Sequence, residues 1–168
     1  VFGILLSLGS AVLFLLAFLL GWKYMVQEKR CTAKTTGTVF RYSYSSKNGG
    51  VRLPVVKYTV NGKEYKVTGP QYKAYAYSSV TSPVASNHQE YSEDGQVFKV
   101  KNTTNGFIGV IKNPMSELYP LNSQIDVFYD PKKPKLAYVL RYCNLKYIFW
   151  MLFGSGVFVL VTDLLILF

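Results

Sequence analysis

The sequence predicts two transmembrane α-helices flanking a small all-β domain, an antiparallel barrel or sandwich. Three observations support this fold class. Each end of the 168-residue chain is strongly apolar, and the charged residues lie almost entirely between those ends. The polar middle contains roughly six or seven short runs rich in β-branched and aromatic residues. No long helical pattern separates these runs, which favours antiparallel pairing.

The two apolar ends are long enough to cross a membrane. Residues 1–22 carry no charge, and residues 147–168 carry a single acid, Asp163. At about 1.5 Å per residue, each segment spans roughly 30 Å as a helix, which matches the hydrocarbon core of a bilayer. A secretory signal is the alternative for the first segment, but its apolar run is too long and no cleavage pattern follows it. We therefore expect two membrane spans.

The basic residues near these spans predict the orientation of the chain. All 19 Lys and Arg lie between the two apolar segments, in a chain with a net charge of +10. Because cytoplasmic segments next to a span are enriched in Lys and Arg, the middle domain is expected in the cytoplasm. The juxtamembrane basic residues are Lys23, Lys29, Arg30, Lys34, Arg141 and Lys146.

Residues 37–141 are predicted to form the β-domain. The basic juxtamembrane segment, residues 23–36, is expected to continue the first helix until Thr35, Thr36 and Gly37 end it. The remaining elements are strands with period-two alternation. They are expected at residues 38–44, 51–60, 63–68, 96–101, 107–112, 124–129 and 136–140.

The clearest signal is the stretch VKYTVNGKEYKV at residues 56–67. Apolar and polar residues alternate on both sides of Asn61-Gly62, which is typical of a β-hairpin with a two-residue turn. This pairing puts Lys57 directly opposite Lys66. Like charges at such positions are destabilising by a few tenths of a kcal/mol.

Residues 71–118 interrupt the series of strands. Apart from the runs at 96–101 and 107–112, the segment is polar and tyrosine-bearing without a sustained period. We therefore expect a long surface loop or excursion rather than core.

Three blocks of sequence carry a resemblance to a known family. They are GTVFRY at 37–42, LPVVKYTVNGKEYKVT at 53–68 and LNSQIDVFYDPKKPKLAYV at 121–139. The blocks resemble the bacterial membrane-protein family catalogued as domain of unknown function 3592. Its members read G-x-V-V, then P-V-V-x-Y-x-V-x-G-K-x-Y, then V-x-V-x-Y-D-P-x-x-P-x-x-A, beside one or more spans. The resemblance implies this architecture in a bacterial plasma membrane, but no activity. Many members have a much shorter link in place of residues 71–118.

The chain contains no pattern typical of an enzyme. His88 is the only histidine, and there is no Gly-rich phosphate loop. Glu90, Glu93 and Asp94 are expected to form a solvated loop face. We therefore expect a non-enzymatic protein with no cofactor or metal.

Three features in or near the spans leave alternatives open. Cys31 and Cys143 lie just outside the two spans, so a disulfide is expected in an extracellular domain and two thiols in a cytoplasmic one. Asp163 is costly inside a span, so we expect it to reach the opposite interface or to pair with another subunit. The small residues at 9–11 and 154–156 fall at different depths of an antiparallel pair. They are expected to pack against other helices at least as readily as against each other.

The basic residues of the middle domain point to a binding function. A basic domain tethered to a bilayer is attracted to anionic lipid or to an acidic protein partner. We expect an accessory subunit of a membrane complex, and no nucleic-acid binding because no stacking platform is evident. One alternative is an immunity-type protein that intercepts a toxin or peptide with an extracellular domain, and another is a transporter or enzyme component that uses Asp163. The sequence does not define the oligomeric state. The residues expected to bind are Arg52, Lys57, Lys63, Lys66 and Lys73.

Overall fold

The computed structural model describes residues 2–47, 50–81, 88–104 and 112–167, and the chain divides into two compact units. One unit is helical and comprises Val1–Lys29 and Asn144–Phe168, and the other is the β-rich unit Arg30–Cys143. The predicted fold class, two long apolar helices flanking a nearly closed antiparallel β-domain, is confirmed.

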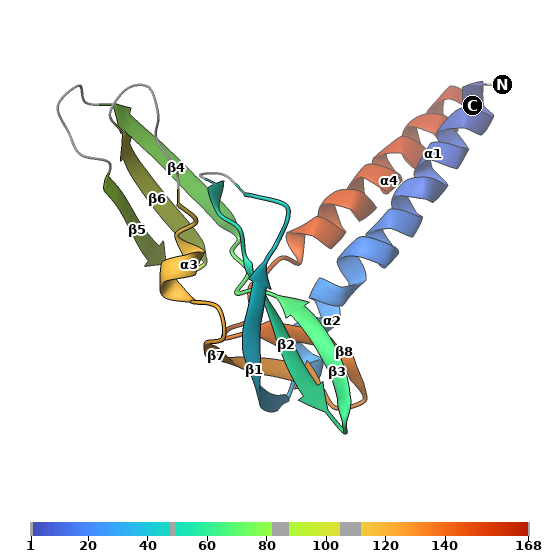
Figure 1. Cartoon of the computed structure of the whole chain (residues 1–168). Coiled ribbons are helices and arrows are strands. Elements are labelled where there is room, and N and C mark those ends of the chain that lie inside the picture. Colours follow the sequence, from blue (N-terminus) through green and yellow to red (C-terminus); the bar gives the residue numbers. More distant parts are fainter. Residues whose placement is uncertain (1, 48–49, 82–87, 105–111, 168) are drawn as a thin grey trace. The chain divides into compact units, whose positions relative to one another are not determined.

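The helical unit is a pair of antiparallel helical runs (Figure 1). The first run consists of α1 (Phe2–Leu16), a π-helical turn η1 (Ala17–Gly21) and α2 (Trp22–Arg30), and the second is α4 (Tyr147–Leu167). Leu6–Arg30 and Tyr147–Ile166 are each long and apolar enough to span a membrane. The expected end of the first helix is wrong. The helix stops at Arg30, and Thr35–Gly37 lie inside a strand.

Five strands form the main sheet of the β-domain. Its order is β3-β2-β1-β7-β8, and all neighbouring pairs are antiparallel. The edge strands β3 and β8 also contact each other, so the sheet is nearly closed. Each strand corresponds to a predicted one; the bounds of β3 agree with the prediction and those of the other four are shifted. The bounds are β1 (Ala33–Tyr42), β2 (Pro54–Val60), β3 (Lys63–Thr68), β7 (Gln124–Asp130) and β8 (Lys133–Val139).

Strand alternation builds the core inside this sheet. Val56, Tyr58 and Val60 of β2 point inward and pack with inward residues of the other strands, because successive side chains of a strand point to opposite faces. The Tyr58 hydroxyl donates to the Pro134 carbonyl on β8 at 2.5 Å, which satisfies its polar end. The other buried members are Val39, Ile125, Val127, Ala137 and Val139.

A second sheet occupies most of the segment expected to be a loop. It contains β4 (Ala74–Thr81), β5 (His88–Asp94) and β6 (Val97–Thr104) in the order β4-β6-β5. The expectation of a loop at 71–118 is therefore wrong, although the strand at 96–101 is confirmed as part of β6. Strand β4 pairs with β6 in parallel, which departs from the antiparallel pattern elsewhere. The strand expected at 107–112 lies almost entirely outside the described residues.

This second sheet has a hydrophobic core of its own. Phe98 and Val100 of β6 are buried against Val51, Leu53 and the four-residue helix α3 (Met115–Leu118). Tyr72 completes the cluster by packing on Phe98, with ring centroids 5.0 Å apart. The sequence does not predict this core, because it draws on residues more than 60 positions apart in the chain, and no local period reveals such packing.

Candidate functional site

The most concentrated group of cations surrounds one aromatic ring on β1. Strand β1 pairs Val39 with Val56 and Arg41 with Val55, so Phe40 is the extra residue of a β-bulge. Its ring lies 4.8 Å from Lys57 Nζ and 5.2 Å from Lys66 Nζ. The Arg41 guanidinium carbon lies 5.4 Å from the same ring. These distances are within the range of cation–π attraction.

The bulge explains how the sheet tolerates its like-charge pair. Lys57 does lie opposite Lys66, as predicted. Repulsion of a few tenths of a kcal/mol is offset by cation–π contacts of about 0.5–1 kcal/mol each. Lys57 Nζ also lies 3.3 Å from Glu64 Oε1, an exposed ion pair of small value. The pair is thus stable within the fold, and three cations around one ring still leave this face positive.

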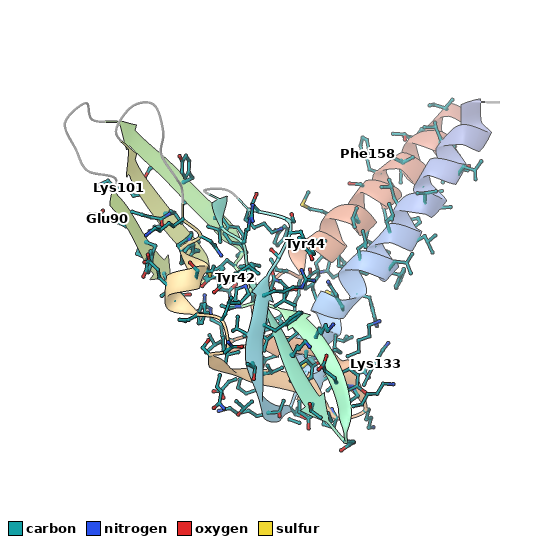
Figure 2. The ribbon with its side chains drawn as sticks, in the orientation of Figure 1. Tyr42, Tyr44, Glu90, Lys101, Lys133 and Phe158 are labelled. Atoms are coloured by element: carbon teal, nitrogen blue, oxygen red, sulfur yellow. The ribbon has the colours of Figure 1, made fainter. Side chains whose placement is uncertain are left out.

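A second aromatic residue extends the group. The Arg41 guanidinium carbon lies 4.5 Å from the ring centroid of Tyr44, whose side chain is 87% exposed (Figure 2). We call this set the Phe40 cluster; it consists of Phe40, Arg41, Tyr44, Lys57 and Lys66.

The sequence predicts only part of the Phe40 cluster. Lys57 and Lys66 are expected to bind, but Phe40, Arg41 and Tyr44 are not among the predicted residues, since a bulge leaves no clear mark in the sequence. Of the other residues expected to bind, Lys63 begins β3, the strand that carries Lys66. Arg52 and Lys73 make backbone hydrogen bonds with Asn113 and Gln96, respectively, in the part of the domain that holds the second sheet.

Most of the juxtamembrane basic residues form ion pairs. Arg30 lies 2.6 Å from Asp130, Lys34 lies 2.9 Å from Asp126, and Lys146 lies 2.5 Å from Glu28. Arg141 pairs with Glu93. Lys23 Nζ lies 4.6 Å from the Tyr24 ring, and Lys29 is exposed on α2. Acids thus neutralise four of these six cations.

Both cysteines are free and buried, so the disulfide alternative is wrong for this structure. The Cys31 thiol donates to the Leu136 carbonyl at 3.3 Å, and the Cys143 thiol contacts Gln96 Oε1 at 3.9 Å. Burial and, to a smaller extent, the negative charge of Asp130 raise the pKa of Cys31 to about 11, against the opposing effect of Arg30. Such a thiol stays protonated and unreactive near neutral pH.

Glu93 is part of a polar network rather than a solvated loop. Arg141 donates to both of its carboxylate oxygens at 3.1–3.2 Å, and the Tyr72 hydroxyl donates to one of them. The Arg141 guanidinium carbon also lies 4.9 Å from the Tyr72 ring. Burial raises the pKa of Glu93, but the hydrogen bonds from Arg141 and Tyr72 outweigh this effect and leave the pKa lowered. The network joins the second sheet to the segment after β8.

Asp163 finds a partner on the other helix of its own chain. Its side chain is buried and accepts a hydrogen bond from the Ser7 hydroxyl. The Ser10 hydroxyl donates to the Gly156 carbonyl at 3.0 Å, so the small residues at 9–11 and 154–156 do meet. The expectation that these small residues lie at different depths is therefore wrong.

Comparisons with protein-family models, with curated proteins and with solved structures found no match. No group of three metal-ligating side chains occurs within the described ranges. The fold and side chains thus define a two-helix protein carrying a β-domain with one positively charged aromatic face.

We expect Gly156→Leu to weaken the packing of α1 against α4 by about 1–3 kcal/mol. A side chain at Gly156 would start 3.0 Å from the Phe14 ring, whereas one at Gly154 would meet nothing within 4 Å. Gly154→Leu is therefore the matched control, since both changes raise helix propensity equally. Thermal unfolding of the helical circular-dichroism signal in mild detergent measures the difference. Equal melting temperatures for the two variants would contradict the described packing.

We expect Glu93→Gln to lower the free energy of unfolding of the β-domain at neutral pH. The variant should also lose less of this free energy than the wild type as the pH falls. Because the pKa of Glu93 is lowered in the folded state, its contribution is present above the unfolded pKa of about 4.5 and disappears as the pH falls through the folded value. Denaturant titrations at several pH values measure this dependence. Glu90→Gln, at an exposed ion pair with Lys101, is the control and should change the acid dependence less.

Proposed function

We propose that this chain is a non-enzymatic membrane protein whose β-domain binds the anionic surface of the cytoplasmic leaflet through the Phe40 cluster. The observation that carries the proposal is the placement of Lys57, Lys66 and Arg41 around one ring. Near an anionic bilayer, each Lys or Arg contributes about 1 kcal/mol. Aromatic side chains such as Tyr44 favour the headgroup region.

The two apolar helices strengthen this weak electrostatic binding, because they keep the β-domain close to the bilayer surface. Leu6–Arg30 and Tyr147–Ile166 are suited to hold the chain in a bilayer. A tethered domain meets the surface of that bilayer at high effective concentration, so a few kcal/mol are enough to keep it bound. The proposed cytoplasmic side follows from the positive-inside rule and agrees with two buried, unlinked cysteines.

An acidic protein partner is the alternative ligand for the same face, as expected of an accessory subunit. Membership of the bacterial family of domain of unknown function 3592 remains part of the proposal, and it adds no activity. The hydrogen bond between Ser7 and Asp163 supports a role for Asp163 in pairing the helices. A polar transport path through Asp163 has no comparable supporting contact among the described residues, and neither does an immunity-type function.

We expect the double variant Lys57→Gln and Lys66→Gln to reduce binding to anionic vesicles by roughly 30-fold, which corresponds to about 2 kcal/mol. The full chain in phosphatidylcholine nanodiscs is mixed with vesicles rich in phosphatidylserine, and bound protein is measured by co-flotation. Binding should weaken as salt is added, because ions screen exposed charges.

The matched control removes two lysines from the second sheet. Lys99 lies 2.7 Å from Asp94 and Lys101 lies 3.5 Å from Glu90, so Lys99→Gln with Lys101→Gln makes the same change in net charge outside the Phe40 cluster. This control should retain most of the binding. Equal losses in both double variants would reject a specific role for the Phe40 cluster. Binding to an acidic protein without binding to vesicles would favour the alternative ligand.

A further inference from the structure

The three cations of the Phe40 cluster converge on one small area of the sheet. Lys57 and Lys66 lie opposite each other in the β2–β3 register, so their side chains leave the same face. Their ammonium groups lie 4.8 and 5.2 Å from the Phe40 ring centroid, and the Arg41 guanidinium carbon lies 5.4 Å from it. Because a ring has only two faces, at least two of these cations share one side of it. Their charge is therefore concentrated rather than spread along the strands.

One hydrogen-bond donor within this group has no acceptor. The Arg41 Nη1 atom is buried and has no hydrogen-bond partner among the described residues. Buried donors in folded proteins are normally paired, since an unsatisfied one is costly. Lys57 has Glu64 beside it, but neither Arg41 nor Lys66 forms an ion pair with a described acid. The cluster thus lacks an acceptor that carries negative charge.

Tyr44 controls how a ligand reaches this donor. Its ring lies 4.5 Å from the Arg41 guanidinium carbon, and its side chain is 87% exposed. An exposed side chain changes rotamer within nanoseconds. The ring can therefore move aside and admit an acceptor to the guanidinium without any change in the backbone of β1.

We propose that the Phe40 cluster binds a phosphomonoester lipid headgroup in preference to a phosphodiester one. This inference rests on the proposed binding of the cluster to an anionic leaflet and names the headgroup that it selects. A phosphomonoester carries about −1.5 to −2 charges near neutral pH and has three strong acceptor oxygens. The planar fork of Arg41 matches two such oxygens, whereas Lys57 and Lys66 act as compact point charges beside the same group.

Other anionic groups fit this arrangement less well. A phosphodiester headgroup such as that of phosphatidylglycerol carries a single negative charge on two terminal oxygens. The headgroup of phosphatidylserine also contains an ammonium, which would meet the cations of the cluster. An acidic polypeptide distributes its carboxylates along a chain, whereas the cluster concentrates its cations around one ring. The compact phosphomonoester gains most, since the attraction between charges rises as their separation falls.

The experiment compares two lipids and two conservative substitutions. The full chain in phosphatidylcholine nanodiscs is mixed with phosphatidylcholine vesicles that contain either phosphatidic acid or phosphatidylglycerol. The lipid fractions are adjusted so that both vesicles have the same electrophoretic mobility, and co-flotation at neutral pH gives both dissociation constants. Arg41→Lys keeps the charge but removes the planar fork. Arg52→Lys makes the same change at an exposed arginine outside the cluster and is the matched control.

We expect the wild type and Arg52→Lys to bind phosphatidic acid about tenfold more tightly than phosphatidylglycerol, as one additional charge-assisted hydrogen bond can provide. Arg41→Lys should reduce this ratio to about two. Misfolding would weaken binding to both lipids equally and leave the ratio unchanged.

Equal binding of the wild type to the two lipids would overturn this inference but not the proposed function. A ratio that survives Arg41→Lys would also overturn it. Release from phosphatidic acid by an equal concentration of glycerol 3-phosphate would reject the lipid as the source of the phosphomonoester. Failure to bind either vesicle would overturn the proposed function and this inference together.

Discussion

The register of the β2–β3 hairpin is the constraint on which the rest of the β-domain depends. Asn61 and Gly62 both have positive φ, of 50° and 73°, as a two-residue hairpin turn requires. This turn sends Val56, Tyr58 and Val60 into the core and leaves Lys57 opposite Lys66 on the outer face. A slip of one residue would exchange the two faces. The positive face is therefore a direct consequence of a well-packed core, and the bulge at Phe40 supplies the ring that stabilises it.

The helical unit meets a different requirement, since polar groups among apolar helices need partners within the protein. Ser10 and Asp163 are both buried and each has a hydrogen-bond partner on the facing helix. Large apolar side chains remain outside the pair, such as Phe158 of α4, which is 71% exposed (Figure 2). An apolar exterior around polar groups that bond between the two helices suits a hydrocarbon environment, and this pattern supports an anchoring role for both helices.

Local patterns in the sequence predicted those parts of the fold that local interactions determine. The hairpin at Asn61-Gly62, both long helices and the strand pair β7–β8 were all recognisable from alternation, turn residues or apolar length. The second sheet was missed because β4 pairs in parallel with β6, more than 20 residues further along the chain, and because its core includes the distant residues Val51 and Met115. Two of the five members of the Phe40 cluster were predicted, since its two lysines follow from the hairpin register. The ring between them depends on a bulge, and Glu93 acquired its role only through the distant Arg141.

The central claim is that the positive face of the β-domain meets an anionic leaflet on the cytoplasmic side. The most direct test is the sidedness of an exposed cysteine introduced at Ser92, because both native thiols are buried and give a low background. Intact cells and lysed cells expressing the full chain are treated with a membrane-impermeant maleimide. Labelling of Ser92→Cys only after lysis is the predicted result. Labelling in intact cells would place the domain outside and contradict the proposed binding to the cytoplasmic leaflet.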